Sequence, residues 1–168
     1  MYTDRVRRRS GKRIKFSSPL PIDVYDRNVV VSANATNEWD SLWGAMTPIT
    51  SGASYAWLSK KNGGVFPLEY SLNLKENMYI SGLIYKCWDG FITGRILGYK
   101  VLDHNRVVLA EGTWSNDESI KTVAFNPTNT NKITLVATST MGGTIDVTYN
   151  NNTMANIMDI GLMRSYML

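Results

Sequence analysis

Two residue types that build many catalytic and metal sites are nearly absent from this sequence, which has one cysteine, Cys87, and one histidine, His104. A single cysteine excludes an intrachain disulfide, and it favours a reducing compartment over a disulfide-stabilised secreted scaffold. A zinc site needs several protein ligands, which one cysteine and one histidine do not supply convincingly. The carboxylates are scattered and form no recognisable acid–base pair. We therefore expect no enzymatic activity.

Long hydrophobic runs are also missing. No stretch approaches the roughly 20 apolar residues that a helix needs to cross a bilayer. The chain begins with cations, but no apolar segment follows them as it would in a secretory signal. We therefore expect neither a signal peptide nor membrane insertion.

Positive charge is scarce outside the first 15 residues. These residues carry seven cations and one anion, whereas the remaining 153 carry 11 cations and 13 anions. The seven cations of this arm are Arg5, Arg7, Arg8, Arg9, Lys12, Arg13 and Lys15. The high isoelectric point thus belongs to the arm, while the body lacks the excess of cations that is typical of a nucleic-acid-binding domain.

The arm is compatible with three roles. It can neutralise phosphates of a nucleic acid, resemble a localisation signal, or dock on a protein subunit and fold as it binds. Tyr2, Val6, Ile14 and Phe16 are interleaved with the cations. Docking arms need such apolar residues and purely phosphate-binding tails do not, so the pattern favours contact with protein subunits of a larger assembly.

The rest of the chain reads as strands separated by turns. Residues 16–28 form an extended connector, since Pro19 and Pro21 disfavour helix in their neighbours. Strands are predicted at 29–35, 67–74, 79–88, 95–103, 106–114, 120–127, 132–140, 144–151 and 155–163, with a hairpin at 103–105. Such spacing indicates one all-β domain over residues 29–168, a jelly-roll-like antiparallel sandwich preceded by the arm and connector of residues 1–28.

Six short motifs resemble the discoidin family, the coagulation-factor C-terminal-type domains that include the family 32 carbohydrate-binding modules. They are LNLKE, ISGLIYKC, TGRILGYKV, LAEGTWSN, KTVAFNP and NKITLVATS, and they occur in the family's order. The ending MANIMDIGL resembles the family's closing strand. The resemblance covers residues 65–163 well and 29–64 loosely. It implies a discoidin-like sandwich with its binding loops gathered at one end.

The resemblance also raises the question of calcium, because many family members hold this ion in a loop that contains an aspartate. In the corresponding stretch, AMTPITSGASYAW, Thr47 stands where that aspartate would be. Calcium prefers several oxygen ligands that include carboxylates. We therefore expect no metal and no other cofactor.

A glycan site pairs an aromatic face with planar polar groups that bond the hydroxyls of the sugar. Trp88 is the leading candidate, since it lies in a predicted loop with Lys86 and Asp89 beside it. Trp43 with Asp40, and His104 with Arg106, are the next candidates. Trp39, Trp57 and Trp114 are predicted to be core residues instead.

Together these features predict a non-enzymatic structural or adhesion component of a large assembly. A bacteriophage virion protein, such as a capsid auxiliary or decoration protein assembled in the host cytoplasm, combines an anchoring arm with a sandwich that displays a glycan-binding surface outward. Two alternatives remain open. One is a free, lectin-like carbohydrate-binding module that recognises a cell-surface glycan, and the other is a protein that binds nucleic acid through the arm.

Overall fold

The structure is a computed structural model that describes residues 20–23, 30–36, 38, 42–50, 56–59, 66–89, 94–141 and 155–165. The arm lies outside these residues. The described elements are β1 (Leu20–Asp23), β2 (Val30–Ala35), α1 (Thr47–Thr50), β3 (Trp57–Leu58), β4 (Leu68–Lys86), β5 (Ile96–Leu102), β6 (Val108–Thr113), β7 (Lys121–Thr140), β8 (Asn156–Ile157) and β9 (Asp159–Arg164). The predicted all-β class is confirmed. None of the helices in these residues is long and apolar enough to span a membrane.

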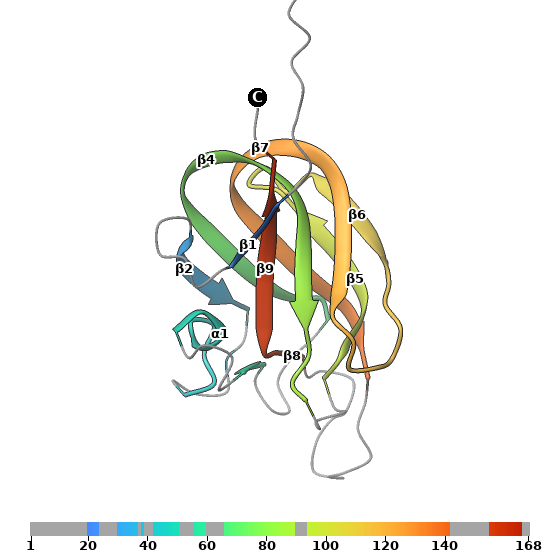
Figure 1. Cartoon of the computed structure of the whole chain (residues 1–168). Helices are drawn as coiled ribbons and strands as arrows, with labels where there is room; N and C mark the ends of the chain where they lie inside the picture. Colours follow the sequence, from blue (N-terminus) through green and yellow to red (C-terminus); the bar gives the residue numbers. More distant parts are fainter. Residues whose placement is uncertain are drawn as a thin grey trace, which may run out of the picture.

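Two long strands, β4 and β7, bend so that each contributes to both layers of the sandwich (Figure 1). In the first layer, the early part of β4 lies between β2 and the late part of β7, and β5 and β6 continue the sheet. In the second layer, the late part of β4 lies between β9 and the early part of β7, and β1 pairs with β9. All of these pairings are antiparallel. The predicted sandwich is therefore confirmed.

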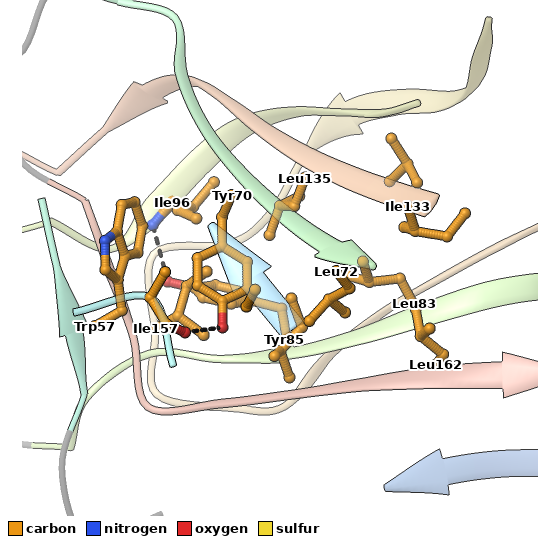
Figure 2. Packing of buried hydrophobic residues seen from close by; sticks show 14 of the residues in the cluster. Trp57, Tyr70, Leu72, Leu83, Tyr85, Ile96, Ile133, Leu135, Ile157 and Leu162 are labelled. Carbon is orange, nitrogen blue, oxygen red and sulfur yellow. Dashed lines mark hydrogen bonds between the residues drawn. The ribbon is translucent and has the colours of Figure 1, made fainter. Parts of the chain in front are cut away.

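The hydrophobic core lies between the two layers. The alternation in residues 67–74 predicts one apolar face, and Leu68, Tyr70 and Leu72 are indeed 0–1% exposed. Figure 2 shows Tyr70 and Leu72 together with Leu83 and Leu162 of the second layer. Alternate residues of a strand point to opposite faces, so one short pattern is enough to identify which side of β4 faces the core.

Aromatic rings fill the core toward one end of the sandwich. Trp114 stacks between Tyr85 and Tyr99, with ring centroids 5.0 and 4.0 Å from its own. The ring centroids of Trp57 and Tyr70 are 5.3 Å apart. The predicted core positions of Trp57 and Trp114 are confirmed, whereas Trp39 lies outside the described residues.

Four predicted strands are merged into two. The predictions for 67–74 and 79–88 describe the two parts of β4, and those for 120–127 and 132–140 describe the two parts of β7. The pairing between β4 and β7 is interrupted between Asn73 and Met78, while the backbone of β4 stays extended. Three exposed polar residues, 75–77, occupy the bend of β4 and contain neither Gly nor Pro, so nothing in the local sequence ends the strand.

Two further sequence expectations concern the edges of the sheet. Residues 20–23 of the extended connector form β1 and pair with residues 161–164 of β9, so this part of the connector adds a strand to the second layer. The hairpin at 103–105 joins β5 to β6, as expected. The strand expected at 144–151 lies outside the described residues.

The sandwich has two distinct ends. At one end, which we call the loop end, β4 stops at Lys86, β5 starts at Ile96 and β7 starts at Lys121, with β8 nearby. We call the arch end the one where β4 and β7 bend and where the β5–β6 hairpin meets Thr130. The span of β4 between the two ends, Met78 to Lys86, is about 26 Å long at the usual rise of an extended strand.

Candidate functional site

The loop that carries Trp88 is anchored to β8. The Trp88 amide donates a hydrogen bond to the side-chain oxygen of Asn156 at 3.0 Å, and the Met158 amide donates to the carbonyl oxygen of Lys86 at 3.0 Å. Asn156 is itself fully buried. The backbone just after β4 is therefore fixed relative to the core, which gives Trp88 a defined position.

Trp88 meets the other candidate tryptophan of this end, Trp43. Their ring centroids are 5.0 Å apart and their planes are inclined by 42°. Both rings are half-buried and pack, together with Met158, against the buried side chains of Ala56 and Leu58. The pair thus forms an aromatic surface that is held in a defined orientation by this packing and that remains partly exposed.

Lys86 and Asp89 supply polar groups next to this surface. The Lys86 ammonium donates a hydrogen bond to Asp89 at 3.0 Å, and the two side chains are 28% and 52% exposed. A donor and an acceptor therefore lie on either side of Trp88 along the chain. Asp40, the residue predicted to accompany Trp43, lies outside the described residues.

The remaining candidates, His104 and Arg106, lie at the arch end and away from Trp88. The His104 ring nitrogen Nδ1 and the hydroxyl of Thr130 are hydrogen-bonded at 2.9 Å. Arg106 forms an ion pair with Glu69. The structure thus separates the predicted glycan candidates into two groups, with Lys86, Asp89, Trp43 and Trp88 together and His104 and Arg106 apart from them.

A second polar cluster supports the loop end and was not predicted. The ammonium of Lys121 is buried, and it donates hydrogen bonds to Ser115 at 2.9 Å, to Ser119 at 2.8 Å and to the carboxylate of Asp117. The hydrogen bond from Lys121, followed by those from Ser119, holds the pKa of Asp117 well below its usual range. These contacts fold the 115–119 loop around the first residue of β7.

Cys87 joins this loop to the one that carries Trp88. Its thiol lies 4.0 Å from the carbonyl oxygen of Asp117, and only 2% of Cys87 is exposed. Burial raises the pKa of the thiol, against the opposing influence of Arg95. The side chain of Arg95, 9% exposed, pairs with Glu118 at 3.0 Å. Buried side chains of this kind hold loops in place but offer little surface to a ligand.

The stretch compared above with a calcium loop contains α1. The hydroxyl of Thr47 donates a hydrogen bond to the carbonyl oxygen of Leu42 at 2.8 Å. Among the residues that the structure describes, no three His, Cys, Asp or Glu side chains are close enough to hold a metal ion together. The expected absence of calcium stays a prediction, because the described residues leave gaps on both sides of α1.

Several solved structures with this fold are carbohydrate-binding modules. The family 32 module of NanJ from Clostridium perfringens, in complex with galactose, superposes with a TM-score of 0.70 at 23% identity and covers 86% of this chain and 100% of its own. The CpGH89 module CBM32-5 of the same organism, in complex with GalNAc-β-1,3-galactose, gives 0.67 at 22% identity, covering 84% and 99%. The chain has the fold of the family 32 carbohydrate-binding modules. The resemblance that the sequence motifs indicate is therefore confirmed at the level of the fold.

A third structure extends the comparison. The CBM32-3 module of a family 31 glycoside hydrolase from Clostridium perfringens superposes with a TM-score of 0.69 at 16% identity, covering 86% of this chain and 94% of its own. No family model and no curated protein matches the chain. At these identities the likeness concerns the fold, so the binding residues have to be argued from the chain itself.

Proposed function

We propose that the sandwich is a carbohydrate-binding module that recognises a glycan through Trp88 and Trp43 at the loop end. The observation that carries this proposal is the half-buried tryptophan pair beside the Lys86–Asp89 ion pair. An aromatic face takes up the apolar face of a pyranose ring, and nearby polar groups bond its hydroxyls. The solved structures with this fold include modules in complex with galactose and with GalNAc-β-1,3-galactose, which supports the ligand class.

Each side chain has a distinct role in this proposal. Trp88 stacks on the sugar ring, and Trp43 supports it and extends the stacking surface. Asp89 accepts hydrogen bonds from sugar hydroxyls and Lys86 donates them. Because the two rings are already packed against the protein and their backbone is bonded to β8, little conformational entropy is lost when they bind.

The proposal assigns binding without catalysis. The neighbours are carbohydrate-binding modules, and their names do not describe them as catalytic domains. Asp89, next to Trp88 in the chain, is engaged by Lys86, and Asp117 of the neighbouring loop is engaged by Lys121. A carboxylate held in an ion pair acts as a hydrogen-bond acceptor rather than as a general acid at neutral pH.

The expectation of a virion component finds no support in the fold or in its neighbours. The fold and its neighbours instead support the alternative, a carbohydrate-binding module. Attachment to protein subunits or to nucleic acid through residues 1–28 stays a prediction, and so does the location of the protein.

Replacing Trp88 by Ala tests the proposed function. Titration calorimetry of the full chain with galactose and with GalNAc-β-1,3-galactose should show a loss of about 1–3 kcal/mol in binding free energy. Trp88→Phe should retain part of the affinity, because it keeps a ring. Ile120→Ala, which truncates a side chain 62% exposed in the 114–120 loop, is the matched control and should bind normally.

Thermal melting of the same variants separates binding from packing. Unchanged affinity in Trp88→Ala would exclude this tryptophan as the stacking residue. Absence of glycan binding by the wild-type chain, together with a lower melting temperature of Trp88→Ala, would leave Trp88 and Trp43 as a packing cluster only.

A further inference from the structure

We propose that a groove on the outer face of the first layer is a second ligand site, and that it takes a neutral polyhydroxylated molecule such as a sugar unit of a glycan. The groove has a volume of about 420 Å³. The lining residues that matter here are Phe66, Glu69, Lys100, Arg106, Val136 and Thr138. It shares no residue with the Trp88 surface, so the two sites stand or fall separately.

The pairing of the strands places the groove on the face that looks away from the core. Glu69 of β4 is opposite Val136 of β7, which in turn is opposite Lys100 of β5. Neighbouring positions such as Tyr70 and Leu135 point into the core. Since successive side chains alternate between faces, the row of Glu69, Val136 and Lys100 lies on the outer face.

Apolar side chains form the floor of this groove although they are outside the core. Val136 and Leu102 are only 4% and 6% exposed, yet neither belongs to the core cluster between the layers. Phe66 adds an aromatic ring at the start of β4, and it also packs against the core. The apolar surface that the groove exposes therefore comes from Phe66 and Pro67, and the buried Val136 and Leu102 support it from beneath.

Arg106 closes one side of the groove in a strained conformation. Its backbone φ is 63°, which non-glycine residues adopt rarely. The hairpin holds it there, because the Arg106 amide donates to the Asp103 carbonyl at 3.0 Å and the Val107 amide donates to the Asp103 carboxylate at 2.8 Å. Its guanidinium then donates two hydrogen bonds to Glu69, at 2.5 and 3.2 Å. Such a bidentate pair presents planar polar groups in a fixed geometry.

The lining of the groove carries one carboxylate, Glu69, and two cations, Lys100 and Arg106. Arg106 is paired with Glu69, and Lys100 is paired at 3.3 Å with Glu111, which lies outside the lining. Because each cation already has a carboxylate partner, the groove does not attract an anion as two unpaired cations would. A neutral polyol can instead bond both to the donors and to the acceptors, with the Thr138 hydroxyl as a further partner, while an apolar ring face rests on Phe66. This combination is what a sugar requires.

The test follows methyl resonances of Val136, Leu102 and Thr138 in the full chain by NMR. Galactose, lactose and N-acetylgalactosamine are added to millimolar concentration, with sialic acid and glucosamine as charged comparisons. We expect saturable shifts of these methyl groups with a neutral sugar and none with the charged ones. Arg106→Gly should weaken this binding about tenfold or more, since it removes the charged hydrogen-bond donor.

The variants are chosen so that folding does not obscure the result. Glycine accepts a φ of 63° readily, so Arg106→Gly removes the guanidinium and relieves the backbone strain. Glu69→Gln keeps the shape of the acceptor and should also weaken binding. Trp88→Ala should leave the shifts in the groove unchanged, even if it abolishes binding at the loop end.

Three outcomes would overturn the groove as a glycan site. The first is the absence of saturable shifts at its methyl groups with any of the neutral sugars. The second is binding of the charged sugars only. The third is binding that disappears in Trp88→Ala and persists in Arg106→Gly, because the shifts would then report the loop end.

Discussion

Asn156 holds Trp88 in place through its side chain, whose oxygen accepts the Trp88 amide at 3.0 Å. The backbone amide and the backbone carbonyl of Asn156 are also hydrogen-bonded. Its amide donates to the Gly94 carbonyl at 2.9 Å, and its carbonyl accepts the Tyr85 hydroxyl at 3.1 Å. The same hydroxyl accepts the Ile96 amide at 3.1 Å. One residue of β8 therefore ties the end of β4 to the start of β5.

Asn156→Ala should lower both stability and glycan affinity. The substitution leaves the backbone bonds of Asn156 intact and removes the acceptor of the Trp88 amide, a loss of about 1–3 kcal/mol when a half-buried donor is left without a partner. Urea unfolding and calorimetry with galactose measure the two effects. Asn34→Ala is the matched control; it removes only an exposed hydrogen bond from Asn73 at 3.0 Å, so its effect on stability should be small and its glycan affinity unchanged. A variant with unchanged stability and affinity would show that β8 does not position Trp88.

The ion pair between Asp117 and Lys121 makes stability depend on pH. The pKa of Asp117 is lowered in the folded state, first by the hydrogen bond from Lys121 and then by those from Ser119. A carboxyl group with a lowered folded pKa stabilises the protein above its unfolded pKa of about 4, and the contribution is lost as the pH falls through the folded pKa. Asp117→Asn should therefore lower the melting temperature most at neutral pH, and the difference from wild type should shrink in acid.

Melting curves between neutral and acidic pH provide the measurement. Glu76→Gln, at the exposed bend of β4, is the control, and it should follow the wild-type curve closely. A difference between Asp117→Asn and wild type that stays constant with pH would contradict the electrostatic account. The buried ammonium of Lys121 would then depend on Ser115 and Ser119 alone.

The sequence predicts local features of this fold well. The alternation in 67–74 identifies the core face of β4, and the Asp103–Asn105 turn locates the β5–β6 hairpin. Each of these features depends on residues close together in the chain. They need no knowledge of what lies across the sandwich.

Features that depend on distant segments are missed. The contact of Trp43 with Trp88 and the anchoring of Trp88 by Asn156 join segments that no local pattern relates. The burial of Lys121 is a tertiary effect, because a lysine at the start of a strand is ordinarily exposed. The separation of His104 and Arg106 from Trp88 likewise follows from the length of β4 and not from their spacing in the sequence.

Calcium is expected to leave the stability of the chain unchanged. Thr47 takes the place of the expected aspartate, and its hydroxyl is already bonded to the Leu42 carbonyl. Ions that bind only the folded state raise the melting temperature by mass action. Melting curves with added calcium and with a chelator should coincide, and magnesium serves as the comparison. An upward shift with calcium that the chelator reverses would place a metal site in the loops around α1.

Deleting residues 1–15 should leave the sandwich folded and remove its capacity to join a larger assembly. The deleted segment holds the seven clustered cations, whereas the first described strand begins only at Leu20. Thermal melting of the truncated and full chains checks the first part. Loss of the cooperative transition on truncation would instead show that the arm contributes to the core.

The second part of this prediction separates protein docking from binding to nucleic acid. Because Val6, Ile14 and Phe16 are interleaved with the cations, we expect the arm to prefer a protein surface. Fluorescence anisotropy of a short DNA duplex tests the competing role, with the full chain and the deletion compared over a range of salt concentrations. Affinity that requires the arm and falls steeply with salt is typical of phosphate contacts, and this result would assign the arm to nucleic acid. Weak DNA binding that is equal in the full chain and the deletion would favour protein subunits as the partners of the arm. Equal glycan affinity of the two chains would show that the arm and the Trp88 surface act independently.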